Sequence, residues 1–237
     1  MEGTIVNTAA VLIGGAAGLL LRWRFPERVR DTVMQGIGLA SLLIGFQMAL
    51  QTRNVLGIIL SLSLGGVIGE WLRIEDRLEA VGAWAERRIG RGSESNVARA
   101  FVTSSLLFCV GPMTVLGSIQ DGLGQPPLLL YTKALLDGIS SVAIGAALGP
   151  GVLLSAGTVL VYQGALTAGA GALQQVLTPE MTRELTAAGG VLIVGLALGI
   201  LQIRRIRVAN LLPSLVVIVC LLAAAPRLGP LGRLLGL

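Results

Sequence analysis

Two aspartates, Asp121 and Asp137, stand in otherwise apolar stretches and are the residues of this sequence best suited to chemistry. A carboxylate at the centre of a bilayer costs roughly 2.5–3.5 kcal/mol on insertion scales, so it is a functional candidate by default. On a helix, small polar side chains share a face with each aspartate, because positions three and four residues apart are neighbours. With a glutamine from a later apolar stretch, they form the predicted solute-binding site: Ser118, Gln120, Asp121, Asp137, Ser140, Ser141 and Gln163.

Three of these residues also have a structural interpretation. Asp121-Gly122 suits a turn, and Asp137 is placed to pair with Lys133 one helical turn earlier. Gln163 is equally able to bridge two helices. The functional interpretation gains from Gly111-Pro112, which is expected to break the helix that leads to Asp121, since transporters expose backbone carbonyls to a solute at broken helices.

The elements that position these residues are predicted to be membrane spans. The chain has 237 residues, of which 54% are hydrophobic and 13% charged, whereas a soluble domain has about 25% charged residues. Runs of about 18 apolar residues are long enough to cross the hydrocarbon core. They cover residues 5–21, 33–51, 55–72, 98–119, 134–149, 152–173, 187–203 and 208–225.

The predicted fold is therefore all-α, a polytopic transmembrane helix bundle of about eight spans. Only Gly149-Pro150-Gly151 separates the fifth and sixth stretches, so one kinked helix there would leave seven spans. We expect a single integral membrane domain over residues 1–237. Within it, residues 73–97 have apolar positions at helical spacing between alternating charges, which predicts a cytoplasmic amphipathic connector.

Basic residues predict the orientation of the bundle. In the eight-span arrangement, 13 of the 18 basic residues fall in the loops after the first, third and seventh spans. The positive-inside rule then places residues 22–32, 73–97 and 204–207 in the cytoplasm and both termini outside. We expect the bacterial cytoplasmic (inner) membrane as the location. Two smaller expectations concern the inner edge: Glu70 pairs with Arg73, and Asn210 caps the last helix.

Glycines predict how the spans pack. The chain contains 33 glycines, and pairs four residues apart let helix backbones approach closely in lipid. Residues 14–22 and 65–73 both match the pattern GGxxGxxLR at the ends of the first and third spans. This match indicates either two copies of a helical hairpin or two unrelated Gly-rich helices that each end in Arg.

Other features exclude several classes of function. The chain has no His to activate a Ser or Thr nucleophile, so we do not expect an enzyme. It also has no nucleotide-binding glycine motif and no cluster of metal ligands, so we expect no cofactor. The net charge of +5 is explained by loop arginines at a membrane surface rather than by binding to nucleic acid. Cys109 and Cys220 lie in apolar runs, and no disulfide is expected.

Five segments resemble the YdfK/YqgA-like family of uncharacterised bacterial membrane proteins, and together they extend over almost the whole chain. They are residues 3–7 (GTIVN), 101–111 (FVTSSLLFCVG), 117–122 (GSIQDG), 131–141 (YTKALLDGISS) and 207–213 (RVANLLP). The resemblance implies a membrane protein of a family with a domain-of-unknown-function label and a general expectation of transport.

Two functions are compatible with these observations. The first is a transporter or channel for a small solute, with a cation favoured by the two aspartates. The second is a scaffold or regulator without transport activity, acting through the helix at residues 73–97. The expected partners are the lipid bilayer, the solute or ion and, as a further option, a second copy of the chain.

Overall fold

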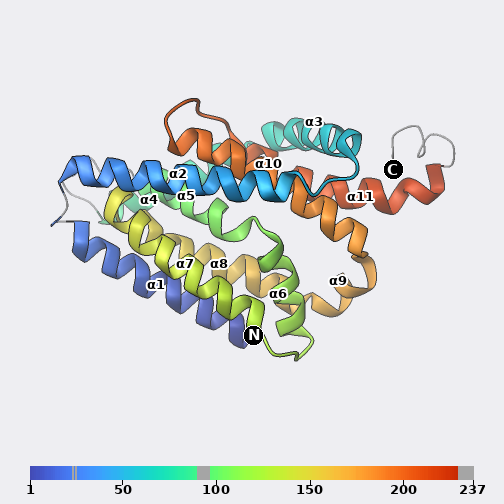
Figure 1. The fold of residues 1–237 in the computed structure, drawn as a ribbon, viewed down its shortest axis with the longest axis horizontal. Helices are drawn as coiled ribbons and strands as arrows, with labels where there is room; N and C mark the ends of the chain where they lie inside the picture. The colour runs from blue at the N-terminus through green and yellow to red at the C-terminus, as the bar shows by residue number, and fades with distance from the viewer. Residues whose placement is uncertain (23, 25, 90–96, 229–237) are drawn as a thin grey trace.

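The computed structural model describes residues 1–22, 24, 26–89 and 97–228, and the regular elements of this part of the chain are all helices (Figure 1). The first six are α1 (Glu2–Arg22), α2 (Glu27–Ala49), α3 (Val55–Leu72), α4 (Ile74–Ile89), α5 (Val97–Cys109) and α6 (Pro112–Gly122). They are followed by α7 (Leu128–Leu148), α8 (Gly151–Ala168), α9 (Ala170–Val176), α10 (Pro179–Ile200), the 3-10 helix η1 (Val208–Leu211) and α11 (Pro213–Leu228).

The predicted all-α bundle of membrane spans is confirmed. Among the described residues, seven helices are long and apolar enough to cross a membrane, and α5 with α6 makes an eighth if the bent pair is one span. The two halves of this pair meet at 63°. The break falls at the predicted position because Pro112 has no backbone N–H to donate and therefore starts a new helix, α6, after Gly111.

The fifth and sixth predicted spans are two helices, α7 and α8, so the interpretation of residues 134–173 as one kinked span is wrong. Gly149 ends α7 with φ of 100°, a backbone conformation that side chains larger than hydrogen rarely adopt. Pro150 follows and cannot continue the helix. Each of the two helices is long enough to cross the membrane by itself.

Side-chain caps set the start of two spans. Asn54 Oδ1 accepts the N–H of Gly57 at 2.7 Å and starts α3. Thr178 Oγ1 accepts the N–H of Met181 at 3.1 Å and starts α10, which is why this helix begins before the apolar run predicted at residues 187–203. The first turns of α10 therefore carry a buried carboxylate, that of Glu184, into the bundle.

Close glycine packing is confirmed between α1 and α7, which lie side by side in Figure 1. A Cβ added to Gly14 would lie 2.2 Å from the carbonyl oxygen of Gly138, and one added to Gly18 would lie 2.2 Å from that of Val142. No side chain fits at such distances, so the two backbones touch. The residue numbers rise together along the contact, which makes the helices parallel.

The second glycine pair makes a different contact. A Cβ on Gly65 of α3 would lie 2.3 Å from the backbone nitrogen of Ser214, and one on Gly69 would lie 1.8 Å from the carbonyl oxygen of Asn210. Here the numbers run in opposite directions, so α3 is antiparallel to η1 and α11. The glycines of both GGxxGxxLR segments thus contact the backbone of another helix, but the first pair contacts a parallel helix and the second pair contacts antiparallel ones.

The helix ends gather at two ends of the bundle. One of them, called the inner end because the arginines predict that it faces the cytoplasm, has Arg22 beside the turn at residues 149–151 and the end of α3 beside η1. This end carries most of the arginines and is the one predicted to face the cytoplasm. At the outer end, the start of α1 meets the end of α6. Arg91 and the rest of residues 90–96 of the predicted connector, and Arg233 of the tail, lie outside the described residues.

Lipid and core faces differ as a membrane bundle requires. Among the seven helices that can each cross the membrane alone, α10 is the most buried, with 61% of an 18-residue stretch buried inside the protein. Other helices expose large apolar side chains on the surface of the bundle, among them Leu39 on α2, Val67 on α3 and Leu135 on α7. Such exposure is stable in hydrocarbon, where these side chains need no further partner.

Candidate functional site

Buried polar side chains form a hydrogen-bonded network in the outer half of the bundle. Asn7 of α1 is at its centre, because its Nδ2 donates to Asp137 Oδ2 of α7 at 3.0 Å and to Gln163 Oε1 of α8 at 3.0 Å. Asn7 and Gln163 are fully buried, and Asp137 is 8% exposed. Buried polar groups are costly without partners, and the amide of Asn7 provides a hydrogen-bond donor for one buried side chain on α7 and one on α8.

The network continues from Gln163 to Asp121. Gln163 Nε2 donates to Thr4 Oγ1 at 3.3 Å, and the Thr4 hydroxyl lies 3.4 Å from Asp121 Oδ2 and 3.1 Å from Thr167 Oγ1. The backbone N–H of Thr4 also donates to Asp121 Oδ2, at 3.3 Å. Asp121 is therefore part of α6 and binds the first turn of α1, in place of the turn with Gly122 that its sequence also allowed.

Each carboxylate of the network has a cationic partner. The α-amino group of Met1 donates to Asp121 Oδ1 at 2.9 Å. Lys133 Nζ pairs with Asp137 Oδ2 one helical turn away, as the structural interpretation of that spacing predicted. The side chains of Lys133 and Asp137 are 7% and 11% exposed, which makes this a buried ion pair. The network is balanced in charge. Removing either partner of the Lys133–Asp137 pair leaves a buried charge uncompensated, whereas in the pair of Met1 and Asp121 only the carboxylate is buried.

The structure brings three of the predicted site residues, Asp121, Asp137 and Gln163, into this one network. The two aspartates do not bind each other directly; they are joined through α1 and Gln163. Ser118 and Ser141 are fully buried, each within one helical turn of an aspartate, and no described residue forms a hydrogen bond with their Oγ atoms.

Gln120 and Ser140, the other two predicted site residues, are half-buried and lie outside the network as described. Gln120 directly precedes Asp121, so the helical turn of about 100° per residue puts it on another face of α6. Ser140 and Ser141 both follow Asp137 at helical spacing, but Ser141 is the one turned into the bundle. Spacing alone did not separate these neighbours.

Sequence reasoning missed Thr4, Asn7 and Thr167 as members of the network. A signal was present in their spacing: Thr4 and Asn7 are three residues apart on α1, and Gln163 and Thr167 are four apart on α8. Each pair puts two polar side chains on one face of an apolar helix. Asn7 Oδ1 is, with the two serine hydroxyls, a buried oxygen without a hydrogen-bond partner.

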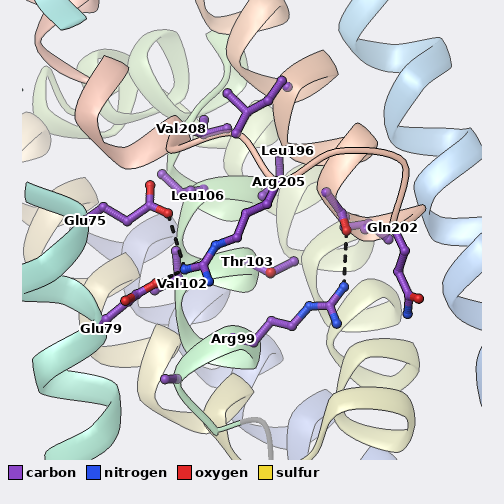
Figure 2. A pocket seen from close by; sticks show the side chains of 15 residues that line it. Glu75, Glu79, Arg99, Val102, Thr103, Leu106, Leu196, Gln202, Arg205 and Val208 are labelled. Atoms are coloured by element: carbon purple, nitrogen blue, oxygen red, sulfur yellow. Dashed lines mark hydrogen bonds and ion pairs between the residues drawn. The ribbon is translucent and has the colours of Figure 1, made fainter.

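A pocket of about 1020 Å³ at the inner end is a second candidate site (Figure 2). Glu75 and Glu79 of α4 lie on one side, and Arg205 of the loop after α10 points toward both. Its guanidinium pairs with Glu79 and lies 3.7 Å from Glu75 Oε1. Across the pocket, Arg99 of α5 donates to the carbonyl oxygen of Gly199 at 3.1 Å.

Glu75 ties α4 to this pocket. Its side chain is 7% exposed, and its Oε2 accepts the N–H of Ala209 at 3.2 Å. Burial raises the pKa of the Glu75 carboxyl above its ordinary value, and the Ala209 N–H and the charges of Arg205 and Arg207 offset part of that rise. The helix found at residues 74–89 thus binds the bundle through Glu75 and Glu79, and Ile74 and Leu78 also pack against the core.

Two contacts at the inner edge differ from expectation. Glu70 binds Arg207 at 2.9 Å and Asn210 Nδ2 at 2.7 Å, whereas the sequence favoured a pair with Arg73. The reason is that Arg73 ends α3 in the left-handed conformation, with φ of 49°, and leaves the helix face. Asn210 does cap a helix, but its Oδ1 accepts the N–H of Glu75 at 2.8 Å, at the start of α4 rather than of α11.

An apolar layer lies between the pocket and the outer network. Leu106 and Leu196 line the pocket and belong to one core cluster with Val110, which directly precedes the break between α5 and α6. Beyond the break, α6 carries Ser118 and Asp121 toward the outer end. The described residues contain no group of three or more His, Cys, Asp or Glu side chains placed to hold a metal ion.

The fold and the buried network define a polytopic helical membrane protein, and comparison with known proteins agrees. The chain matches the family model described as "Protein of unknown function (DUF554)" over residues 2–223 and belongs to that family. It is 29% identical to "Uncharacterized membrane protein YdfK" of Bacillus subtilis (strain 168), over 92% of this chain and 93% of the relative. It is 30% identical to "Uncharacterized protein YqgA" of Escherichia coli (strain K12), over 94% of this chain and 96% of the relative. No solved structure matches the chain.

Proposed function

We propose that this chain transports a small cation across the bacterial inner membrane and that Asp137 is the ligand the cation must reach. The buried network around Asn7 carries the proposal. Placing an ionisable or amide side chain inside a membrane costs free energy, and ionisable residues within spans typically mark the pathway of a solute or ion. Three buried oxygens of this region have no hydrogen-bond partner in the part of the chain that the structure describes, and they are suited to a cation: Asn7 Oδ1, Ser118 Oγ and Ser141 Oγ.

The pairing of Asp137 suggests how binding would occur. Its Oδ2 atom is occupied by Lys133 and Asn7, so an incoming cation competes with the lysine ammonium for the same carboxylate. Lysine suits such an exchange because its ammonium is a point charge on a flexible stem. Binding would release Lys133 from Asp137, and departure of the cation would restore the pair. The chain has no histidine to activate a serine, so we propose movement of a solute rather than catalysis.

The broken span and the inner pocket supply the rest of a pathway. The pocket gives a solute access to the bundle from the inner end as far as Leu106. Beyond it, the 63° break between α5 and α6 is a point where α6 can tilt without breaking regular helical hydrogen bonds. A tilt of α6 would move Ser118 and Asp121 relative to α1, which opens the outer network to the pocket.

Cation flux into proteoliposomes tests the proposal. The purified full-length chain would be reconstituted into liposomes, and the flux of Na⁺, K⁺ and H⁺ would be followed separately with ion-sensitive dyes. Wild type should give flux of at least one cation above that of protein-free liposomes. The double variant Lys133→Met/Asp137→Asn, which removes both charges of the buried pair, should fold but give no flux. Asp31→Asn, which removes an exposed carboxylate of α2, should transport as wild type does.

Two results would overturn this assignment. Wild-type liposomes that conduct none of the three cations would exclude cation transport and favour the scaffold function through α4. A folded double variant with wild-type flux would show that cations pass without the help of Asp137.

A further inference from the structure

At the inner end, no residue that the structure describes forms an ion pair with Arg22 or Arg30. Arg22 ends α1 and Arg30 lies in the second turn of α2, and their positive charges act on each other. Nη1 of Arg22 and Nε of Arg30 are buried atoms with no hydrogen-bond partner among the described residues. By contrast, Asp121, Asp137 and Glu75 each pair with a cation.

The Arg22 side chain is held in place by the turn between α7 and α8. A Cβ on Gly149 would lie 1.7 Å from Arg22 Nη1, so the guanidinium rests directly on that glycine. The position also has φ of 100°, which favours glycine for a second reason. A guanidinium carries five N–H donors and no acceptor, and it cannot lose its proton in a protein. Two such groups that repel each other and each have a buried N–H to donate favour the binding of an acceptor with negative charge.

We propose that Arg22 and Arg30 bind the phosphate group of an anionic phospholipid from the inner leaflet. The phosphodiester of a phospholipid has two non-bridging oxygens that share one negative charge, in a geometry that arginine recognises, so one phosphate can accept hydrogen bonds from both guanidinium groups and reduce their mutual repulsion. The source is lipid because the site lies at the end of a membrane span. Leu20, on another face of the last turn of α1, is 76% exposed, which indicates that hydrocarbon surrounds α1 almost up to the level of Arg22. Basic groups at this level of a membrane protein attract anionic headgroups.

Lipid-dependent stability of the full-length chain in detergent tests this site. Phosphatidylglycerol should raise the unfolding temperature of wild type more than the zwitterionic phosphatidylcholine does. Arg22→Gln and Arg30→Gln should each lose this difference and bind phosphatidylglycerol about tenfold more weakly, as measured by native mass spectrometry. Arg28→Gln removes one positive charge from an exposed position of α2 and should keep the wild-type difference between the two lipids.

A further measurement separates binding from a structural role. Without added lipid, Arg30→Gln should unfold at the wild-type temperature or above it, because the substitution removes a like charge from beside Arg22. A lower unfolding temperature without lipid would contradict the proposal, as would equal stabilisation of wild type by both lipids. Loss of lipid selectivity in Arg28→Gln would show general surface attraction in place of a site. If inorganic phosphate alone gave the full shift, the ligand would be a free anion and the assignment to lipid would be wrong.

Discussion

The ion pair between Lys133 and Asp137 makes a quantitative prediction about folding. Asp137→Asn keeps an oxygen that accepts the hydrogen bond from Asn7 but removes the charge opposite Lys133. The ammonium is then buried without a counter-charge, since its side chain is only 7% exposed. Breaking a buried pair from one side costs about 3–5 kcal/mol, and the retained acceptor puts Asp137→Asn near the lower end of that range.

The second half of the prediction comes from removing both charges. Lys133→Met alone leaves the Asp137 carboxylate with Asn7 as its remaining partner and should cost a similar amount, about 3–5 kcal/mol. The double variant Lys133→Met/Asp137→Asn contains no uncompensated charge, and its loss should be about 1 kcal/mol or less. The two single variants together would lose about 6 kcal/mol or more in free energy of unfolding, whereas the double variant would lose about 1 kcal/mol or less. The difference between these values is a large coupling energy between the two side chains.

Equilibrium unfolding in mixed micelles measures these free energies for the four proteins of the cycle. If the single losses add up in the double variant, the two side chains do not form a buried pair. Full stability of Asp137→Asn would lead to the same conclusion, since it would mean that water solvates Lys133. Flux measured on the same double variant keeps the question of transport separate from that of folding.

Three further predictions concern packing, pH and topology. Gly18→Ala should lower the free energy of unfolding by about 1–3 kcal/mol, because the new Cβ meets the backbone of α7, whereas Gly157→Ala, with no atom within 4 Å, should raise it by up to about 1 kcal/mol. Thermal unfolding would compare the two variants, and equal effects would contradict close packing at Gly18. Stability should fall as the pH rises from the ordinary pKa of a glutamic acid through the raised pKa of Glu75, since the folded state holds that proton longer. Glu75→Gln should lose this slope, seen in unfolding temperatures across the pH series, and Asp76→Asn should keep it. In a background without the two native cysteines, an impermeant thiol reagent applied from outside should label Gln125→Cys but not Asp76→Cys; the reverse pattern would invert the predicted orientation.

Local properties of the sequence were sufficient to predict the spans. Hydrophobicity over about 18 residues decides whether a segment crosses the membrane, and this requires no knowledge of its neighbours. The break at Gly111-Pro112 was predictable for the same reason, since proline disrupts a helix wherever it stands inside one. The start of α10 was not, because the Thr178 cap lies in polar sequence outside the apolar run.

The candidate site could be predicted only in part. Asp121, Asp137 and Gln163 were identifiable because each is a polar residue in an apolar run, and a membrane makes such residues costly. Their partners were not, because a polar residue near a helix end, such as Thr4, is equally compatible with exposure to water. Whether Ser140 or Ser141 turns inward depends on the rotation of α7 in the bundle, which its neighbours set.

Composition and spacing by themselves thus determined the class of the protein, the position of most spans and the residues with the greatest electrostatic cost. Tertiary structure decided which helices meet. Asn7 contacts Asp137 and Gln163, which are 130 and 156 positions away in the chain. It also placed Arg205 opposite Glu75 and left Arg22 beside another arginine. Such pairings follow from how glycine faces let backbones approach and from which buried group needs a partner, and both depend on the whole bundle at once.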